Sequence, residues 1–182
     1  MQTLDEKYMR QALSLAESAL AAGEFPVGCV FVHEGRVVAR GARIESAGAG
    51  TNEVDHAEIL ALREFYRLPA GVDPKKVCVY CTLEPCLMCF GALVIAGVGK
   101  IVYAYEDAMG GGTDCRLQHL SSFYKDRLPV VVPYVLRDES LGLFQAFFKN
   151  PETDYLKNSY LAAYTLSQRI GSPASTTLPA RI

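Results

Sequence analysis

Two short motifs in this chain carry side chains that can bind a metal and move a proton. His56-Ala57-Glu58 supplies an imidazole and a carboxylate, and Pro85-Cys86-Leu87-Met88-Cys89 supplies two thiols. One His and two Cys are the ligand set of a catalytic zinc site, which keeps its fourth position open for water. Glu58 follows the His by two residues and is placed to work on that water as a proton carrier. The two motifs together indicate zinc-dependent hydrolysis.

The spacing within the second motif supports a metal site. Cys86 and Cys89 are three residues apart, so they share a face if they lie on a helix. Pro85 suits the first turn of that helix, where free backbone N–H groups and the helix dipole favour thiolates, the form that binds zinc. An H-x-E motif followed by P-C-x-x-C is the signature of zinc-dependent nucleobase deamination. We therefore predict one Zn²⁺ per chain, no organic cofactor, and replacement of a ring amine by a carbonyl with release of ammonia.

Residues of these types also serve purely structural roles. A His and a Glu at a helix start often serve capping and solvation, and two thiols on an apolar helix can be core residues. Cys78, Cys81, Cys86 and Cys89 also form a C-x2-C-x4-C-x2-C pattern, which could indicate a closed structural zinc or an iron–sulfur cluster. However, Cys78 and Cys81 lie in a predicted strand, where residues three apart point to opposite faces. We predict these two, together with Cys29, to be core thiols.

Hydrophobic periodicity predicts a helix–strand alternation that can position the motifs. The predicted helices span residues 5–22, 55–68, 86–97, 115–123, 140–149 and 153–170, and the predicted strands span 27–33, 36–43, 76–82, 100–106 and 129–136. His56 and Glu58 would lie on the first turn of the second helix. The first two strands form a hairpin, and the helical crossover between the last two predicts a parallel pair. The fold class is α/β, with a sheet covered by helices on both faces.

Length and composition indicate one globular domain followed by a short extension. The chain has 182 residues, of which half are hydrophobic and 21% are charged. The longest apolar run, residues 92–98, is far shorter than the ~20 residues of a membrane span, and the charged N-terminus lacks a signal-peptide core. We expect a cytoplasmic protein without a membrane partner, with a catalytic domain over residues 1–150. A C-terminal helix over 151–170 should pack on it, and 171–182 should form a disordered tail.

With these residues in place, the chain resembles the cytidine deaminase-like superfamily, and within it the tRNA adenosine deaminase-like, nucleoside and nucleobase deaminase branch. The resemblance covers residues 4–149 and rests on Met9-Arg10-Gln11-Ala12-Leu13, Glu24-Phe25-Pro26-Val27-Gly28-Cys29-Val30, His56-Ala57-Glu58-Ile59 and Thr82-Leu83-Glu84-Pro85-Cys86-Leu87-Met88-Cys89.

The resemblance implies a three-layer α/β/α sandwich. Its mixed five-stranded sheet would begin with an N-terminal hairpin pair and continue with parallel strands. The resemblance further implies zinc on His56, Cys86 and Cys89, Glu58 as the proton shuttle, and a homodimer. Candidate substrate contacts are Phe25, Arg43, Asn52, Ala57, Glu84 and Pro85.

Three departures from the family pattern bear on the substrate. The family usually ends its second strand with a substrate-binding Asn, whereas this chain has Arg43 there, and Asn52 could substitute from the next loop. The residue before the metal His is usually small and here is Asp55, and the basic C-terminal tail of tRNA-acting members is absent. The net charge of −2 also gives no general attraction for nucleic acid.

We therefore expect a free base, a nucleoside or a related aminated heterocycle ahead of tRNA. Deamination of the wobble adenosine of tRNA stays open as the alternative. A catalytically silent zinc protein acting as a partner subunit is a further alternative. Glu58 favours an enzyme over a silent subunit, because a subunit that only binds zinc has no need of a proton shuttle.

Overall fold

The computed structural model describes residues 2–47, 51–69, 71–115 and 119–172. Its strands are β1 (Gly28–His33), β2 (Arg36–Ala42), β3 (Val77–Leu83), β4 (Lys100–Tyr105) and β5 (Val130–Val132). Its helices are α1 (Leu4–Ala21), α2 (Ala57–Phe65), α3 (Leu87–Ala96), α4 (Ser122–Lys125), α5 (Arg137–Lys149) and α6 (Tyr160–Ser167), and Pro74–Lys76 forms a 3₁₀ turn. In the described part of the chain, no helix has the length and apolar character needed to cross a membrane.

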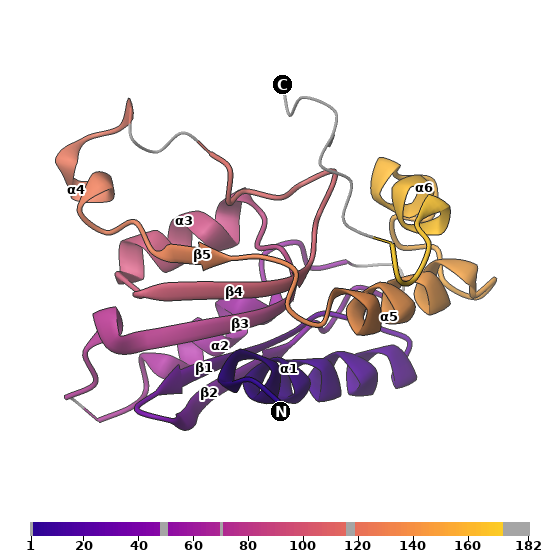
Figure 1. Cartoon of the computed structure of the whole chain (residues 1–182). Helices are drawn as coiled ribbons and strands as arrows, with labels where there is room; N and C mark the ends of the chain where they lie inside the picture. Colours follow the sequence, from indigo (N-terminus) through magenta and orange to yellow (C-terminus); the bar gives the residue numbers. More distant parts are fainter. Residues whose placement is uncertain (1, 48–50, 70, 116–118, 173–182) are drawn as a thin grey trace.

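The five strands form one mixed sheet in the order β2-β1-β3-β4-β5 (Figure 1). β1 pairs antiparallel with both β2 and β3, and the pairs β3–β4 and β4–β5 are parallel. The hairpin between β1 and β2 turns at Glu34 and Gly35, which both have positive φ. The predicted α/β sheet with an N-terminal hairpin and parallel later strands is confirmed.

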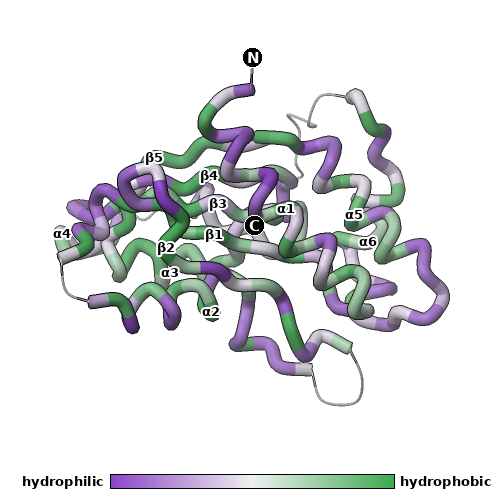
Figure 2. The backbone as a smooth tube through the Cα atoms, turned by 90° about the horizontal axis from the view of Figure 1, so that it is seen from below, coloured by the Kyte–Doolittle hydropathy of each residue, from purple (hydrophilic) through white to green (hydrophobic). Residues whose placement is uncertain are grey.

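Side chains alternate between the two faces of the sheet and give it two hydrophobic clusters. Tyr8, Met9 and Ala12 of α1 pack with sheet residues such as Val30 and Tyr80 on one face. α2 and α3 contact each other on the other face, which is the side below the strands in Figure 2. The central strands β1, β3 and β4 are largely hydrophobic along the backbone trace (Figure 2).

The cysteines outside the P-C-x-x-C motif follow the predicted alternation. Cys81 and Cys29 are buried in the α2–α3 cluster, with their Sγ atoms 3.7 Å apart. Cys78 packs against the opposite cluster, together with the residues of α1. Because Cys78 and Cys81 point to opposite faces, they do not share a metal site.

The C-terminal region differs from the predicted helix over residues 153–170. Helix α6 begins only at Tyr160, and Ser159 caps it by accepting the backbone N–H of Ala162. Residues 151–159, called here the C-terminal segment, form turns, and Leu156 adopts a left-handed backbone conformation with φ 54°. A β-branched or γ-branched residue rarely adopts that conformation within a helix, so the helical periodicity stops there. α6 packs on α5, at the side of the sheet shown in Figure 1.

Two other element boundaries differ from the sequence-based expectation. The last strand is three residues long rather than eight, because Pro129 and Pro133 flank it and cannot donate ladder hydrogen bonds. The predicted helix over 115–123 lies partly outside the described residues, and α4 begins at Ser122. The predicted tail lies outside them from residue 173 onward.

Candidate metal centre and active site

His56 and Cys86 each occupy the N-cap of a helix. His56 precedes α2 and Cys86 precedes α3, both with extended backbone dihedrals, so neither lies within the first turn as predicted. Gly41 of β2 allows α2 to start against the sheet, because a Cβ there would lie 2.0 Å from the carbonyl oxygen of Ala57. Cys89 lies in the first turn of α3 and is fully buried. Two helix starts at one edge of the sheet therefore bring the three side chains together.

The three side chains have the separations of tetrahedral zinc ligands. Their ligand atoms all lie within 4.8 Å of one another, and His56 Nδ1 is 3.5 Å from the Sγ atoms of both Cys86 and Cys89. Zn–S bonds of about 2.3 Å and a Zn–N bond of about 2.1 Å at tetrahedral angles place nitrogen and sulfur about 3.6 Å apart. The geometry and donor set thus fit Zn²⁺, and among the described residues no other group of His, Cys, Asp and Glu comes together in this way.

The electrostatic surroundings of His56, Cys86 and Cys89, called here the triad, favour a thiolate at Cys86. A hydrogen bond from Cys89, supported by His56, lowers the pKa of the Cys86 thiol to about 4. The position of Cys86 at a helix N-terminus acts in the same direction, because the free N–H groups there stabilise negative charge. A deprotonated sulfur is the form that binds zinc.

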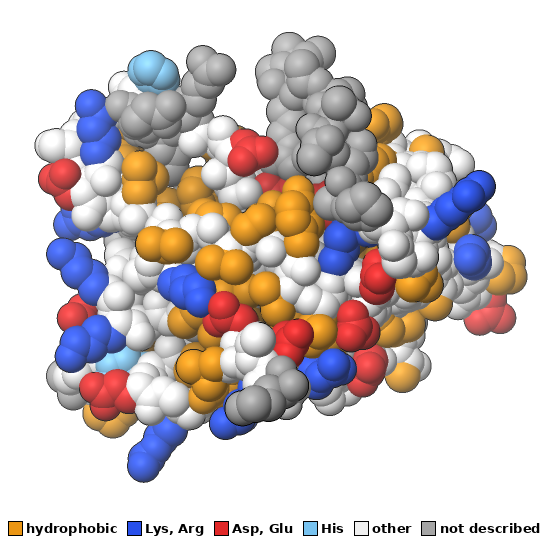
Figure 3. Space-filling view, viewed as in Figure 1, with side chains coloured by type: hydrophobic (Ala, Val, Ile, Leu, Met, Phe, Trp, Pro, Cys, Tyr) orange, Lys and Arg blue, Asp and Glu red, His pale blue; other side chains and the backbone are white. Residues whose placement is uncertain are grey.

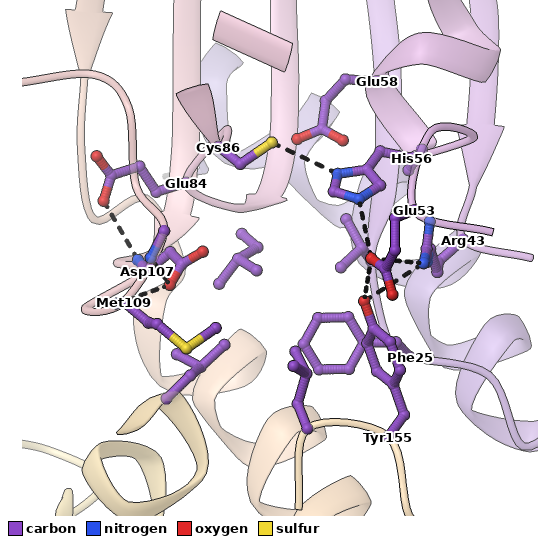
Figure 4. A pocket seen from close by; sticks show the side chains of 16 residues that line it. Phe25, Arg43, Glu53, His56, Glu58, Glu84, Cys86, Asp107, Met109 and Tyr155 are labelled. Atoms are coloured by element: carbon purple, nitrogen blue, oxygen red, sulfur yellow. Dashed lines mark hydrogen bonds and ion pairs between the residues drawn. The ribbon is translucent and has the colours of Figure 1, made fainter. Parts of the chain in front are cut away.

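Glu58 is the buried carboxyl next to the triad. Its side chain is 3% exposed, and burial raises the pKa of the carboxyl to about 7. Figure 4 shows the Glu58 carboxylate beside the Cys86 sulfur and the His56 ring. A carboxyl with a pKa near neutrality can both accept and release a proton at physiological pH.

A pocket opens beside the triad. Its cavity volume is about 180 Å³, and it opens to solvent on one side. Its lining is mostly apolar, with polar groups on opposite walls (Figure 4). The lining residues are Phe25, Val27, Arg43, Glu53, His56, Ala57, Glu58, Leu83, Glu84, Cys86, Asp107, Met109, Gly110, Tyr155, Leu156 and Leu161.

Two of the six candidate substrate contacts lie away from this pocket. The side chain of Asn52 is held in a loop, where it accepts the backbone N–H of Val54 and Asp55 and donates to Glu45. Pro85 is not among the lining residues that the structure describes, and its carbonyl accepts the N–H of Gly112. The other four candidates, Phe25, Arg43, Ala57 and Glu84, line the pocket.

Acidic side chains form the wall opposite Arg43. Glu84 is buried and accepts the backbone N–H of Asp107 and the N–H and hydroxyl of Thr113. Asp107 in turn accepts two backbone N–H groups of the turn that follows it, from Met109 and Gly110. Glu84 therefore anchors the turn that carries Asp107 and Met109 to the pocket, as Figure 4 shows. The pocket-lining position of Asp107 was not predicted from the sequence.

The wall formed by Arg43 also contains two residues that the sequence analysis missed. The Arg43 guanidinium approaches the carboxylate of Glu53 at 3.6 Å and the hydroxyl of Tyr155 at 3.3 Å. The Tyr155 hydroxyl also donates to Glu53, at 3.0 Å. The same Glu53 carboxylate lies 3.9 Å from His56 Nε2 and so faces the side of the ring that points away from the two thiols. Glu53 could have been found from its position three residues before His56, whereas Tyr155 is 112 residues from Arg43.

Comparisons with known proteins agree with this geometry. The family model for the cytidine and deoxycytidylate deaminase zinc-binding region matches residues 2–105. A tRNA-specific adenosine deaminase of Bacillus subtilis (strain 168) is 33% identical over 147 residues, which are 81% of this chain and 90% of the relative. The chain therefore belongs to the cytidine deaminase-like superfamily, in its tRNA adenosine deaminase branch.

Solved structures support the same placement. One comes from studies of A-to-I editing by tRNA:A34 deaminases at the wobble position of transfer RNA. It has a TM-score of 0.62 and 30% identity, and the match covers 75% of this chain and 98% of that chain. Guanine deaminase from Nitrosomonas europaea also has a TM-score of 0.62, with 24% identity over 78% of this chain and 83% of that one, and that likeness shows the fold alone.

Proposed function

We propose that this protein is a zinc-dependent hydrolase that replaces the amine of a purine base by a carbonyl, with adenosine in tRNA as the leading substrate. The observation that carries the reaction is the buried Glu58 carboxyl beside three residues spaced as zinc ligands. The relatives favour adenosine in tRNA, because those at about one-third identity act on it by name and are matched over most of their length. The expectation of a small substrate is therefore moved to second place.

The residues of the site divide the work of this reaction. His56, Cys86 and Cys89 would hold Zn²⁺, which supplies a water acidic enough to attack near neutral pH. Glu58 would carry one proton of that water to the ring nitrogen next to the attacked carbon. It would then carry the second proton, from the hydroxyl group left on that carbon, to the amine, which departs as ammonia. The apolar lining, including Phe25, would hold the flat base and exclude other water.

One observation favours the second candidate, a small aminated heterocycle. A second hollow adjoins the pocket and shares Glu53, Tyr155 and Leu156 with it. Its described lining includes Glu152 and Asp154 but no Lys or Arg. Because a nucleic-acid backbone is bound mainly through cationic side chains, this side of the pocket gives no support to an RNA strand. A free base or nucleoside needs no such support.

The deciding experiment is ammonia release by the zinc-loaded protein. Its substrates are an anticodon stem-loop with a wobble adenosine, the same stem-loop with a wobble inosine, and free bases, nucleosides, nucleotides and other aminated heterocycles. Release from the adenosine stem-loop alone would support the leading substrate, and release only from small heterocycles would replace it by the second candidate. No release from any of them, with zinc bound, would overturn the reaction and favour a silent zinc-binding subunit.

We further propose that the protein acts as a homodimer. On α3, Leu87 and Ile95 expose 60% and 55% of their surface and Met88 exposes 38%, and Val130 of β5 exposes 64%. A band of hydrophobic side chains crosses the middle of the face shown in Figure 3, over the region where Figure 1 shows α3 and β5. Such a contiguous apolar surface is typical of a protein–protein interface. Light scattering after size-exclusion chromatography should give twice the chain mass, and Ile95→Glu should shift the protein to monomers.

A further inference from the structure

The zinc site leaves one ring nitrogen of His56 unused. The Sγ atoms of Cys86 and Cys89 both lie 3.5 Å from Nδ1, so Nδ1 is the atom that would bind zinc. A neutral imidazole that gives its Nδ1 lone pair to a metal carries its proton on Nε2. On that side of the ring, the carboxylate oxygen Oε2 of Glu53 lies 3.9 Å from Nε2. Glu53 is therefore placed to act on His56 from the side opposite the thiols.

The loop before α2 brings Glu53 to this position. The Asn52 side chain accepts the backbone N–H groups of Val54 and Asp55, at 2.9 and 3.0 Å, and so closes a tight turn. The backbone N–H of His56 donates to the carbonyl of Val54 at 2.9 Å. Because the chain folds back on itself here, Glu53 and His56 face each other although they are three residues apart (Figure 4).

Two residues from outside this loop hold the same carboxylate oxygen. The hydroxyl of Tyr155 donates to Oε2 of Glu53 at 3.0 Å, and Nη2 of Arg43 lies 3.6 Å from it. Arg43 is itself fixed, because it is 2% exposed and its guanidinium carbon lies 5.6 Å from the centroid of the Tyr155 ring. Figure 4 shows the Glu53 carboxylate at the point where Arg43, Tyr155 and His56 meet. The contacts of all three residues thus converge on one oxygen.

We propose that Glu53 is a positioning residue for the zinc site: its carboxylate accepts the Nε2–H of His56 and so keeps the Nδ1 lone pair free for the metal. A metal-binding His usually donates its second N–H in this way, which fixes the tautomer and the ring orientation and makes the other nitrogen more basic. Shortening the 3.9 Å separation to a hydrogen bond takes a movement of about 1 Å by a side chain that is 59% exposed.

This arrangement gives the C-terminal segment a part in holding the metal. Tyr155 contacts none of the three zinc ligands through a hydrogen bond, but it holds the oxygen that faces His56. The family match ends at residue 105, so this support of the zinc site comes from outside the matched region.

The first test is the dissociation constant of zinc, measured by competition with a chelator of known affinity. Glu53→Ala should weaken zinc binding about tenfold, the lower end of the range for such partners, because solvent screens an exposed carboxylate. Glu53→Gln keeps an acceptor oxygen without the charge and should lie between Glu53→Ala and the wild type. Glu152→Ala is the matched control, since it removes an equal charge from the adjoining hollow and should bind zinc as the wild type does.

The second test observes the proton itself. Proton–nitrogen NMR of the zinc-loaded wild type should show His56 protonated on Nε2, and Glu53→Ala should speed exchange of this proton with water about tenfold, the effect of one lost hydrogen bond. The chain has three His, so His33→Gln and His119→Gln assign the signals of the other two rings. Thermal midpoints of the zinc-free proteins identify any variant that has lost its fold.

A third test asks whether Tyr155 acts through Glu53. Tyr155→Phe keeps the ring and removes the hydroxyl that donates to Oε2. It should weaken zinc binding about twofold to threefold in the wild type and have no effect in Glu53→Ala, because its partner is then missing. Tyr160→Phe, an exposed Tyr on α6, should have no effect in either protein. Equal losses from Tyr155→Phe in both proteins would show that Tyr155 does not act through Glu53.

The outcomes separate this inference from the proposed function. If the wild type binds no zinc, both are wrong. If the wild type binds zinc and Glu53→Ala binds it as tightly, the inference alone is wrong. It is also wrong if the exchange of the His56 Nε2–H is unchanged in Glu53→Ala. The inference rests on the proposed function only through the zinc site, and no substrate enters these tests, so a failure to release ammonia would overturn the proposed function alone.

Discussion

The zinc-ligand region and the C-terminal segment form two sides of one pocket but are built in different ways. The first takes its residues from two short motifs, 56–58 and 85–89, each placed at a helix start by the sheet. The second is placed by side chains that meet over long separations, such as the contact of Tyr155 with Arg43, 112 residues apart. The first lies inside the family match over residues 2–105, and the second lies outside it.

This difference assigns the two regions different tasks. The His-Cys-Cys ligand set and the Glu form the signature of zinc-dependent nucleobase deaminases of this class, so they come as a fixed local pattern. The C-terminal segment places Tyr155 and Leu156 on the far side of the pocket. This side of the pocket lies outside the family match, so it can differ between chains that share the zinc-binding region.

The largest expected effect comes from removing one zinc ligand. Cys86→Ala should lose stoichiometric zinc and all measurable deamination, because two remaining ligands bind the ion weakly. Zinc content by mass spectrometry and ammonia release would check both. Cys115→Ser is the matched control, since Cys115 is an exposed thiol outside the triad. Retention of one zinc per chain in Cys86→Ala would refute the ligand assignment.

The next largest effect separates metal binding from proton transfer within the same region. Glu58→Gln should keep zinc and lose about 10²- to 10⁴-fold in kcat, the usual contribution of a general acid–base group. Glu17→Gln on the exposed side of α1 should change neither quantity. Normal turnover by the Glu58 variant would show that another group moves the protons.

A third prediction concerns how α6 and the adjoining C-terminal segment are held to the sheet. Arg137 and Glu106 form a buried ion pair in which Arg137 Nε donates to Glu106 at 2.8 Å. Arg137→Met leaves a buried carboxylate without its cation and should lower the free energy of unfolding by about 3–5 kcal/mol. By contrast, Glu139→Gln breaks the exposed pair with Arg10 and should cost less than about 1 kcal/mol. Urea titrations of the two zinc-loaded variants and the wild type would give the free energies of unfolding. Equal losses of free energy in both variants would show that the buried pair does not hold α6 and the C-terminal segment to the sheet.

The smallest expected effect comes from removing one hydrogen bond to the same buried carboxylate, that of Glu106. Tyr164 of α6 donates its hydroxyl to the buried Glu106 carboxylate at 2.8 Å. Tyr164→Phe should lower the free energy of unfolding by about 1.5–3 kcal/mol, the value for a hydrogen bond to a charged group. Tyr160→Phe, one turn earlier on the same helix, should leave stability within about 0.5 kcal/mol of the wild type. A similar loss in both variants would assign the effect to the helix and not to the bond.

The sequence predicted the zinc-ligand region well because its information is local. The motifs, the strands between them and the parallel crossover follow from spacing and periodicity. The helix starts were placed one or two residues too early, because His56 and Cys86 serve as N-caps with extended backbone. Asn52 does not line the pocket, because its side chain is held within its own loop, and spacing alone could not show this.

The C-terminal segment could not be predicted in the same way. The spacing of Tyr155, Leu156 and Tyr160 is compatible with a helix, and only the left-handed backbone of Leu156 and the Ser159 cap break it. Neither feature has a sequence signal as strong as Gly or Pro. The contact between Tyr155 and Arg43 depends on the packing of α5 and α6, which periodicity does not specify.

The brevity of β5 has a consequence for how the protein behaves at high concentration. Val130–Val132 is an apolar run of high β-propensity at the edge of the sheet. A longer run of this kind would offer a row of unpaired backbone groups on which a second chain could add as a strand. Pro129 and Pro133 end the run on both sides and leave too short a template for such addition. The two prolines thus protect the sheet against aggregation through its β5 edge.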